Sequence, residues 1–356
     1  MSARLQEIIA DRIREQGPIG FDEYMRAALY DPEDGFFSRA PVGRHFVTSA
    51  HVSPVFGALL TRALREAWNA LGRPEPFIVA EVGAGDGTLA RRILEVAATD
   101  APFAAAVRYL TVEQDAAARA GLERAGLPAL EALPQEPFTG CLIANELLDN
   151  LPFRLARARD GRTVEVRVGL AGNDLMEVEV AAPDDLARAL DPPLRPGEER
   201  PVSTTAAAFV EDVAGALGRG YVFVFDYGFA FGEVPEPVRG YREHRLVTDL
   251  LADPGATDIT GPVDFAALCR TAQGFGLEVH GLVTQREALM ALGYRRLLDD
   301  MRAEQKSLED TGRWREGIAM YSARGQASML VAPDGLGALK LAVLATPGLP
   351  VPSAAG

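Results

Sequence analysis

The 356-residue sequence is poor in the residues that build metal centres and disulfide frameworks, with two cysteines and four histidines. Cys141 and Cys269 stand far apart, and no histidine pairs with another ligand at a metal-binding spacing. We therefore expect no metal and a reducing compartment. No run of about 18 apolar residues is present, so we expect no membrane-spanning helix. The first residues have the period of a folded helix rather than the anatomy of a signal peptide, and we expect a cytoplasmic protein.

Basic residues are also in deficit, with 36 Lys and Arg against 50 Asp and Glu and a formal net charge of −14. Neutralising a phosphate backbone requires clustered Lys and Arg, so neither nucleic acid nor a membrane surface is expected as the main partner. The acidic excess suits a cationic substrate, although solubility alone would also explain it. With 48% hydrophobic and 24% charged residues, the composition is that of a globular protein.

The rhythm of the chain predicts a doubly wound α/β fold of Rossmann-like type. Short unbroken apolar runs alternate with segments of helical period, which is typical of a buried parallel sheet with crossover helices. The expected strands lie at 77–82, 108–113, 140–144, 221–226 and 277–283. The expected organisation is a helical N-terminal region at 1–75, a core at 76–345 with insertions at about 153–202 and 285–325, and a flexible tail at 346–356.

The insertions have patterns of their own. Residues 163–168 and 175–180 alternate with period two, which predicts a half-exposed antiparallel pair and a candidate homodimer surface. Residues 285–309 have helical period, and a β-rich stretch is expected from there to residue 345.

A glycine-rich turn closes the first expected strand and opens a helix. Its spacing is G-x-G-x-G, which differs from the G-x-G-x-x-G of dinucleotide-binding proteins. Glu81 and Asp86 would repel a pyrophosphate, whereas a carboxylate at the strand end could hold the cationic amino-acid portion of S-adenosylmethionine. A glycine turn without ligand and a nicotinamide dehydrogenase are the alternatives. The candidate cofactor contacts in this turn are Glu81, Gly83, Ala84, Gly85, Gly87 and Thr88.

Polar residues follow three further strands. Glu113 ends the second strand, where a carboxylate can accept hydrogen bonds from both hydroxyls of an adenosine ribose. An ordinary surface glutamate is the alternative. Asn145 and Glu146 follow the third strand, and Asp149 comes one helical turn later. These three are the candidate catalytic residues, with Asn145 also a cofactor contact. Capping of a helix by Asn145 and Glu146 is the alternative.

Asp226 and Tyr227 repeat the pattern at a later strand end and are candidate substrate contacts, with an ordinary loop as the alternative. The histidines form no metal pair, so no metal ligand is assigned.

Taken together, the motifs resemble those of the MidA-type methyltransferases, a family that includes a mitochondrial complex I assembly factor that methylates arginine. The resemblance covers about residues 5–345. It is carried by Gly17-Pro18-Ile19, Tyr24-Met25, Ala28-Leu29-Tyr30-Asp31-Pro32, Gly35-Phe36-Phe37, Phe46-Val47-Thr48-Ser49, Ser53-Pro54-Val55-Phe56-Gly57, Glu81 to Thr88, Asn145 to Asp149, Leu151-Pro152-Phe153, Asp226-Tyr227-Gly228, Arg239-Gly240-Tyr241 with His244, Val263-Asp264-Phe265, and Thr284-Gln285 before Leu292-Gly293.

The resemblance implies cofactor contacts at Glu81, Gly83, Gly85 and Glu113, and a methyl-transfer site flanked by Asn145 and Glu146. It also implies that the loop around Thr48 covers the cofactor or substrate. The substrate contacts expected on this basis, beyond those already named, are Tyr24, Thr48 and His51.

The sequence departs from the family pattern at two places in that loop. Arg44-His45-Phe46 stands where the family usually has Gly-Asp-Phe, and Ala50-His51-Val52 stands where it usually has Pro-Glu-Ile. The second change removes a carboxylate that could have faced a cationic substrate, which weakens arginine as the expected acceptor.

The resulting hypothesis is an S-adenosylmethionine-dependent methyltransferase that releases S-adenosylhomocysteine. A protein arginine is the first acceptor expected, and a small guanidine or amine metabolite is the second. An assembly or scaffold factor that retains the fold without turnover is the alternative from another class of protein.

Overall fold

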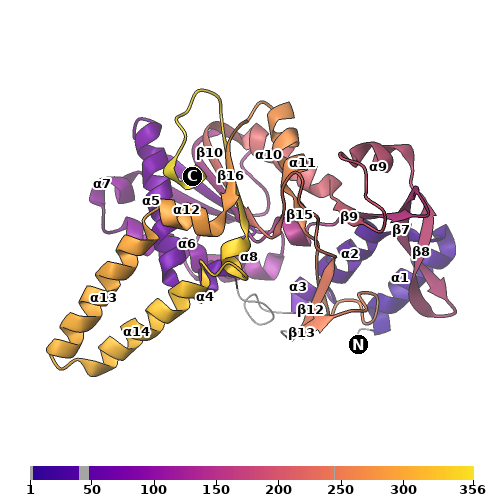
Figure 1. Ribbon diagram of the computed structural model, residues 1–356, viewed down its shortest axis with the longest axis horizontal. Helices are drawn as coiled ribbons and strands as arrows, with labels where there is room; N and C mark the ends of the chain where they lie inside the picture. The colour runs from indigo at the N-terminus through magenta and orange to yellow at the C-terminus, as the bar shows by residue number, and fades with distance from the viewer. Residues whose placement is uncertain (1–2, 40–47, 244) are drawn as a thin grey trace. The chain divides into compact units, whose positions relative to one another are not determined.

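The computed structural model describes residues 3–39, 48–243 and 245–356, and the chain forms two compact units (Figure 1). Unit 1 comprises Met1–Phe46, Leu147–Glu211 and Gly228–Thr271. Unit 2 comprises Val47–Glu146, Asp212–Tyr227 and Ala272–Gly356. This division differs from the predicted linear one: the helical N-terminal region divides after residue 46, and its first part belongs with the inserted segments.

Unit 2 is built on a seven-stranded sheet in the order β16-β17-β10-β5-β2-β3-β4. All neighbours pair parallel except β17, which is antiparallel to both β10 and β16. The predicted doubly wound α/β sheet is therefore confirmed. Its strands are β2 Phe77–Val82, β3 Val107–Val112, β4 Ala129–Leu130, β5 Phe138–Asn145, β10 Leu217–Asp226, β16 Glu278–Thr284 and β17 Lys340–Ala345.

The central strands are apolar on both faces because helices cover both. Val79, Ile143 and Phe223 are completely buried in the core of unit 2. The helices of this unit are α4 Ser49–Val52, α5 Pro54–Ala70, α6 Thr88–Ala97, α7 Ala101–Ala106, α8 Ala116–Arg124, α12 Gln285–Ala291, α13 Tyr294–Asp310 and α14 Trp314–Met329, with 3₁₀ turns η2 Leu336–Ala338 and η3 Ser353–Ala355.

The C-terminal part of unit 2 differs from the prediction in two ways. The segment after residue 309 was expected to be β-rich, but α14 occupies 314–329 and only β17 is a strand. Ile318 is the single β-branched residue of α14, and most of the other positions are Ala, Met, Arg, Gln, Glu, Ser or Gly, which do not favour strands. The tail is not detached: Tyr221 donates to the Pro350 carbonyl at 2.8 Å, and Ala354 is buried.

Unit 1 contains a sheet in the order β1-β7-β6-β9, with β8 paired to β7. The predicted antiparallel pair is confirmed as β7 and β8. Two smaller sheets, β11-β15 and β13-β12-β14, fall in a region expected to be loop. The strands are β1 Ile19–Gly20, β6 Arg154–Arg159, β7 Arg162–Ala171, β8 Asp174–Ala181, β9 Glu199–Val202, β11 Gly228–Phe229, β12 Arg239–Arg242, β13 Arg245–Val247, β14 Asp258–Thr260 and β15 Val263–Asp264.

The core of unit 1 gathers Leu5, Phe21, Phe153 and Val166. The helices of this unit are α1 Ala3–Gln16, α2 Phe21–Tyr30, α3 Phe36–Arg39, α9 Asp184–Ala189 and the 3₁₀ turn η1 Leu148–Asn150, while α10 Thr204–Ala216 and α11 Phe265–Gly274 run from unit 1 into unit 2. Across the residues that the structure describes, no helix has both the length and the apolar character needed to cross a bilayer.

Candidate active site

The polar residues predicted at three strand ends come together on unit 2. Strand β5 lies between β2 and β10, with Val82 opposite Ala144 and Asn145 opposite Phe225. Because these strands run parallel, the residues that follow them emerge at the same edge of the sheet. The glycine-rich turn and the Asn145-Glu146 pair are therefore neighbours, as the sequence predicted.

The glycine-rich turn has a backbone that strongly favours glycine. Gly83, Gly85 and Gly87 have φ values of 72°, 55° and 73°, all in the left-handed region. A Cβ at Gly87 would lie 2.6 Å from Leu127 Cδ1, so packing also disfavours any larger residue at this position. Ala84 is buried, and Thr88 is the first residue of α6. The turn thus presents backbone at the start of a helix, as the cofactor prediction requires.

Glu81 lies at the end of β2 with its carboxyl group almost completely buried. Tyr109 donates its hydroxyl to Glu81 Oε2 at 2.8 Å. Burial raises the pKa of Glu81 to about 8, the Tyr109 hydrogen bond opposes this rise, and the charges of Asp86 and Glu113 add to it. Three carboxyl groups therefore share this turn, and a cationic ligand would relieve their repulsion whereas an anionic one would increase it.

Glu113 follows β3 and faces the glycine-rich turn. Its carboxylate accepts from the backbone N–H of Gly85 at 3.1 Å and from that of Asp115 at 3.2 Å. The side chain thus fixes the turn and the start of α8. Its predicted contact with a ribose is compatible with this position and stays a prediction.

Asn145 and Glu146 do not begin a helix, so the predicted capping role is wrong. Asn145 is the last residue of β5, and Glu146 has a φ of 52°. Only the 3₁₀ turn η1 follows. Asp149 is therefore not one α-helical turn beyond Glu146. It belongs to unit 1, where its carbonyl accepts from Gly261 N at 2.9 Å.

The Glu146 carboxyl group is held by neutral donors. Its Oε1 accepts from Ser49 N at 2.8 Å and from Asn145 Nδ2 at 3.3 Å. Burial raises the pKa of Glu146 to about 7, and the bonds from Ser49 and Asn145 limit the rise. Asn145 Oδ1 is buried and accepts no hydrogen bond within the described parts of the chain. The pair thus offers a titratable carboxyl group beside an unused amide acceptor.

His51 links the segment around Thr48 to the glycine-rich turn. Its Nε2 lies 3.2 Å from Asp86 Oδ2, and its Nδ1 lies 2.7 Å from Thr48 Oγ1. The hydrogen bond to Asp86 raises the pKa of His51. Although burial opposes it, the bonds from His51 and Thr88 lower the pKa of Asp86 to about 2. His51 thus bonds to Asp86 of the glycine-rich turn, and Thr48 bonds to His51. The predicted substrate contacts of both residues stay predictions.

Three residues of this region had no predicted role in the site. Ser49 donates its hydroxyl to Gln285 Oε1 at 3.0 Å, and Gln285 Nε2 donates to the Leu330 carbonyl at 3.0 Å. Tyr109, the partner of Glu81, is the third. One local signal was available, because Thr284 and Glu287 form a capping box that fixes the helix start at Gln285.

Other predicted substrate contacts are placed less favourably. Tyr24 is a core residue of unit 1, completely buried, and its hydroxyl donates to the Leu250 carbonyl at 2.7 Å, so its predicted role is not supported. Asp226 is also completely buried and accepts from Tyr227 N at 2.7 Å. Tyr227 is half-buried at the end of β10. The altered Arg44-His45-Phe46 stretch lies outside the described residues.

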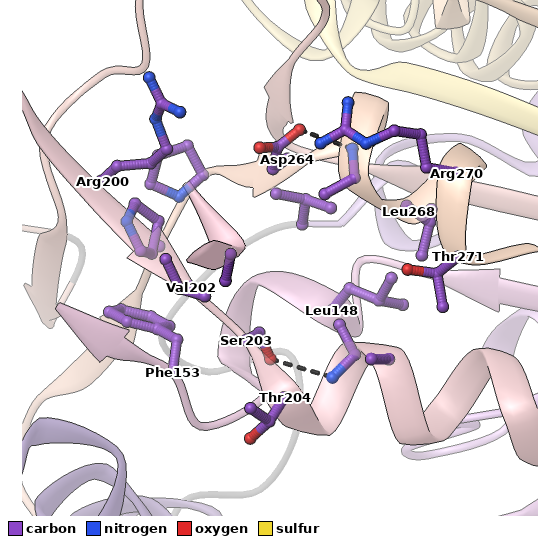
Figure 2. A pocket seen from close by; sticks show the side chains of 18 residues that line it. Leu148, Phe153, Arg200, Val202, Ser203, Thr204, Asp264, Leu268, Arg270 and Thr271 are labelled. Atoms are coloured by element: carbon purple, nitrogen blue, oxygen red, sulfur yellow. Dashed lines mark hydrogen bonds between the residues drawn. The ribbon is translucent and has the colours of Figure 1, made fainter. Parts of the chain in front are cut away.

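Unit 1 contains a separate cavity of about 310 Å³ (Figure 2). Two of its polar side chains are engaged within the protein: Ser203 Oγ accepts from Ala206 N at 2.9 Å, and Asp264 Oδ1 accepts from Ala267 N at 2.8 Å. The cavity therefore presents mainly apolar surface. Its apolar wall includes Leu148, Phe153, Val202, Val263 and Leu268.

No group of three or more His, Cys, Asp or Glu that could hold a metal occurs among residues 3–39, 48–243 and 245–356. The residues gathered on unit 2 are instead carboxyl, amide and backbone groups, which suit an organic ligand with a positive charge.

Comparisons with known proteins identify the same kind of ligand. A family model for S-adenosyl-L-methionine-dependent methyltransferases matches residues 59–283. A mitochondrial protein arginine methyltransferase NDUFAF7 homolog of Drosophila melanogaster is 32% identical over 307 residues, which are 74% of this chain and 69% of that protein. The NDUFAF7 of Homo sapiens is 28% identical over 301 residues, 74% of this chain and 67% of that protein.

A solved structure extends the similarity to nearly the whole fold. A protein of Burkholderia thailandensis solved with S-adenosyl-homocysteine bound is 25% identical, with a TM-score of 0.85. The alignment covers 98% of this chain and 94% of that one. The predicted cofactor and fold class are thereby confirmed, and the chain belongs to this family of class I S-adenosyl-L-methionine-dependent methyltransferases.

Proposed function

We propose that the methyl acceptor is an arginine side chain of a protein. The observation that carries the proposal is the Glu146 carboxyl group, whose burial raises its pKa to about 7, beside the unused Oδ1 of Asn145. A guanidinium group presents several N–H donors and a positive charge, and these two acceptors match both properties. The NDUFAF7 relatives are named as protein arginine methyltransferases, which supports the same acceptor.

The residues of unit 2 fit S-adenosylmethionine. Glu81 would hold its amino-acid portion, the backbone of Gly83 to Gly87 would lie against it, and Glu113 would hold the ribose. Bound there, the cofactor supplies a methyl group already activated by its sulfonium charge. The chain's own residues then have two tasks, which are to align the acceptor and to take up its proton.

Glu146 is placed to receive that proton. A guanidinium has a pKa above about 12, so its proton must leave during or after methylation. A carboxyl group with a pKa near 7 is ionised in half of the molecules at neutral pH and can accept a proton there. Ser49 N and Asn145 Nδ2 hold Oε1 in place, which keeps the carboxyl group oriented.

The test is transfer of labelled methyl from S-adenosylmethionine to three matched acceptors: an arginine peptide, the same peptide with lysine in place of arginine, and free arginine. We expect label in the arginine peptide alone, and its loss with Glu146→Gln. Labelling of free arginine in preference to the peptide would contradict a protein acceptor, and labelling of the lysine peptide would contradict arginine. Absence of transfer despite cofactor binding would favour a scaffold.

Cofactor binding is measured separately by titration calorimetry, with Gly85→Val as the disrupting variant. Valine is strained at the φ of 55° found there. The matched control is Gly172→Val, because Gly172 has a φ of 66°, has nothing within 4 Å of an added Cβ and lies in unit 1. We expect only Gly85→Val to abolish binding.

We also propose the cytoplasm as the location of the protein. Cys141 and Cys269 are both free, which supports a reducing compartment. The named relatives of Drosophila and human are mitochondrial proteins, so fractionation of the source cells is the direct test.

A further inference from the structure

One face of α14 is apolar and open to solvent. Trp314, Ile318, Tyr321 and Met329 have 62%, 67%, 67% and 52% of their surface exposed. They are separated by four, three and eight residues, which places them along one side of an α-helix. Soluble proteins seldom leave such a contiguous apolar patch uncovered.

Arg315 is exposed at the edge of this face, beside Trp314, and the rest of the face is uncharged. Between Ile318 and Met329 the same side of the helix adds only small side chains, Ser322, Gly325 and Ser328, all exposed. The neighbouring helix α13 shows the opposite character, because its exposed residues are mostly charged. They include Arg295, Arg296, Asp299, Asp300, Arg302, Glu304, Lys306 and Asp310. The exposed charged residues of α13 thus run along the whole helix, whereas those of α14, Arg315 and Glu316, lie only at its start.

The α14 face is also held rigidly. Figure 1 shows α13 and α14 as an antiparallel hairpin that projects from the rest of unit 2. Arg324 Nη1 donates to Gln305 Oε1 across the hairpin at 2.7 Å, and Tyr294 donates its hydroxyl to the Ala327 carbonyl at 3.0 Å near its base. At the tip, Arg313 pairs with Glu316. The face is therefore a preformed surface rather than a fraying end.

We propose that this face binds the same face of a second copy of the chain, with the two α14 helices antiparallel. The large side chains lie in the first half of the helix and the small ones mostly in the second half. A two-fold axis between Tyr321 and Ser322 places the first half of one helix against the second half of its copy, and symmetry repeats each contact. The facing pairs are Trp314 with Met329, Ile318 with Gly325, and Tyr321 with Ser322.

A second copy fits this face better than a charged partner does. Apart from Arg315, the face carries no charge that would pair with a basic or acidic protein. On a two-fold axis the two Arg315 side chains lie at opposite ends of the contact, which avoids repulsion between identical charges. The small residues opposite Ile318 and Tyr321 allow the two helices to approach closely. The large side chains of the face on one copy thus fit against the small side chains of the same face on the other copy.

The β7–β8 pair, predicted earlier as a candidate homodimer surface, is less suited to this role. The exposed edge strand β8 carries Glu177 and Glu179, whose carboxylates pair with Arg157. Charges along an edge strand prevent edge-to-edge pairing. The structure therefore favours α14 over β8.

The first test is sedimentation velocity of the full chain at about 1 to 100 μM, a range set by the expected affinity. A helix of 16 residues is about 24 Å long and offers less than the roughly 800 Å² per partner of a stable complex. We therefore expect a dimer that dissociates on dilution. Ile318→Glu should give a monomer throughout the range, because it would bury an unpaired charge against Gly325 of the second copy.

The matched control is Phe231→Glu, since Phe231 is a more exposed apolar residue of unit 1 and lies outside the α14 face. This variant should dimerise like the wild type. A wild-type monomer at every concentration would overturn the proposal, and so would a dimer that survives Ile318→Glu. Flotation of the wild type with phosphatidylcholine vesicles in place of dimerisation would also overturn it, by assigning the face to a lipid surface.

The orientation is tested by oxidative cross-linking in a Cys269→Ser background. Ser322→Cys lies beside the axis and should form an intermolecular disulfide. Gln326→Cys lies on the same helix, but its two copies would stand about 13 Å apart along the axis, beyond the reach of a disulfide. Cross-linking through Gln326→Cys and not through Ser322→Cys would exclude the antiparallel arrangement.

Discussion

Two buried glutamates show how differently the two units use acidic side chains. Glu165 in unit 1 accepts from Arg154 Nε at 2.6 Å and from Arg167 Nε at 2.8 Å. Glu81 in unit 2 is equally hidden, but within the described residues it makes no ion pair, and its partner is the neutral hydroxyl of Tyr109. Burying a carboxylate is costly without a cation. Unit 1 supplies that cation within the protein, whereas Glu81 of unit 2 has only a neutral partner, so we expect a ligand to supply the cation.

The largest effect is expected at Glu146, the other buried carboxyl group of the site on unit 2. Glu146→Gln should lower kcat by roughly 10²- to 10⁴-fold, because it removes the proton acceptor while keeping the shape of the side chain. In the wild type, kcat/KM for the acceptor should rise with pH and level off above about 7, since only the ionised form of Glu146 accepts a proton.

Initial rates between pH 5.5 and 9, at saturating S-adenosylmethionine, check both expectations. If Glu146→Gln kept the rate and the inflection near pH 7, Glu146 would not be the proton acceptor.

Glu165→Gln tests the unit 1 side of the comparison. Removing one partner of a buried ion pair lowers the free energy of unfolding by about 3 kcal/mol when the remaining partner keeps partial access to water. Arg154 and Arg167 both keep such access. We expect the urea midpoint to fall, with the affinity of the folded protein for S-adenosylmethionine unchanged. Lost affinity at unchanged stability would mean that this acid also serves the ligand.

Glu81→Gln is the matched change in unit 2, and the opposite result is expected. The urea midpoint should barely change, because no ion pair is lost. The affinity for S-adenosylmethionine should fall roughly 10- to 100-fold through loss of one charge-assisted hydrogen bond. Titration calorimetry measures the affinity, and equal losses in both properties would erase the contrast between the two glutamates.

The same glutamate predicts a proton release. With a pKa of about 8, Glu81 is mostly protonated at pH 6.5 in the free protein. A bound cation favours the carboxylate, so binding should release a proton and affinity should rise with pH below 8. Titrations at about pH 6.5 in buffers of different ionisation enthalpy measure this release, below the pKa of the ligand's own amino group. Glu81→Gln should show none.

The smallest effect is expected for His51→Ala. The variant removes the contacts of the histidine with Asp86 and Thr48, each a hydrogen bond near the surface. Loss of about 1 kcal/mol corresponds to a roughly five-fold weaker affinity for S-adenosylmethionine. His280→Ala, a change of another histidine in unit 2, should leave the affinity unchanged. An equal effect of both variants would remove any special role of the histidine at position 51.

Much of the site could be predicted because its signals are local. The turn from Gly83 to Gly87 requires left-handed backbone, and glycine shows that requirement in the sequence. Apolar runs without alternation predicted parallel strands, and parallel strands bring Glu81 and Asn145 to one edge of the sheet.

Other contacts could not be predicted in this way. Ser49 donates to Glu146, 97 residues away, and to Gln285, 236 residues away. No periodicity or spacing reports a contact across such distances. Tyr24 was misjudged for the same reason, since its burial depends on the packing of unit 1 around it.

The sequence by itself determined the fold class, the glycine-rich turn and the carboxyl groups near it, because backbone preference and apolar pattern are properties of neighbouring residues. Only the tertiary structure decided which acids are paired and which await a cation, that Asp149 belongs to a different unit from Glu146, and that α14 leaves an apolar face open. Burial and partner charges set these properties, and both come from residues far away in the chain.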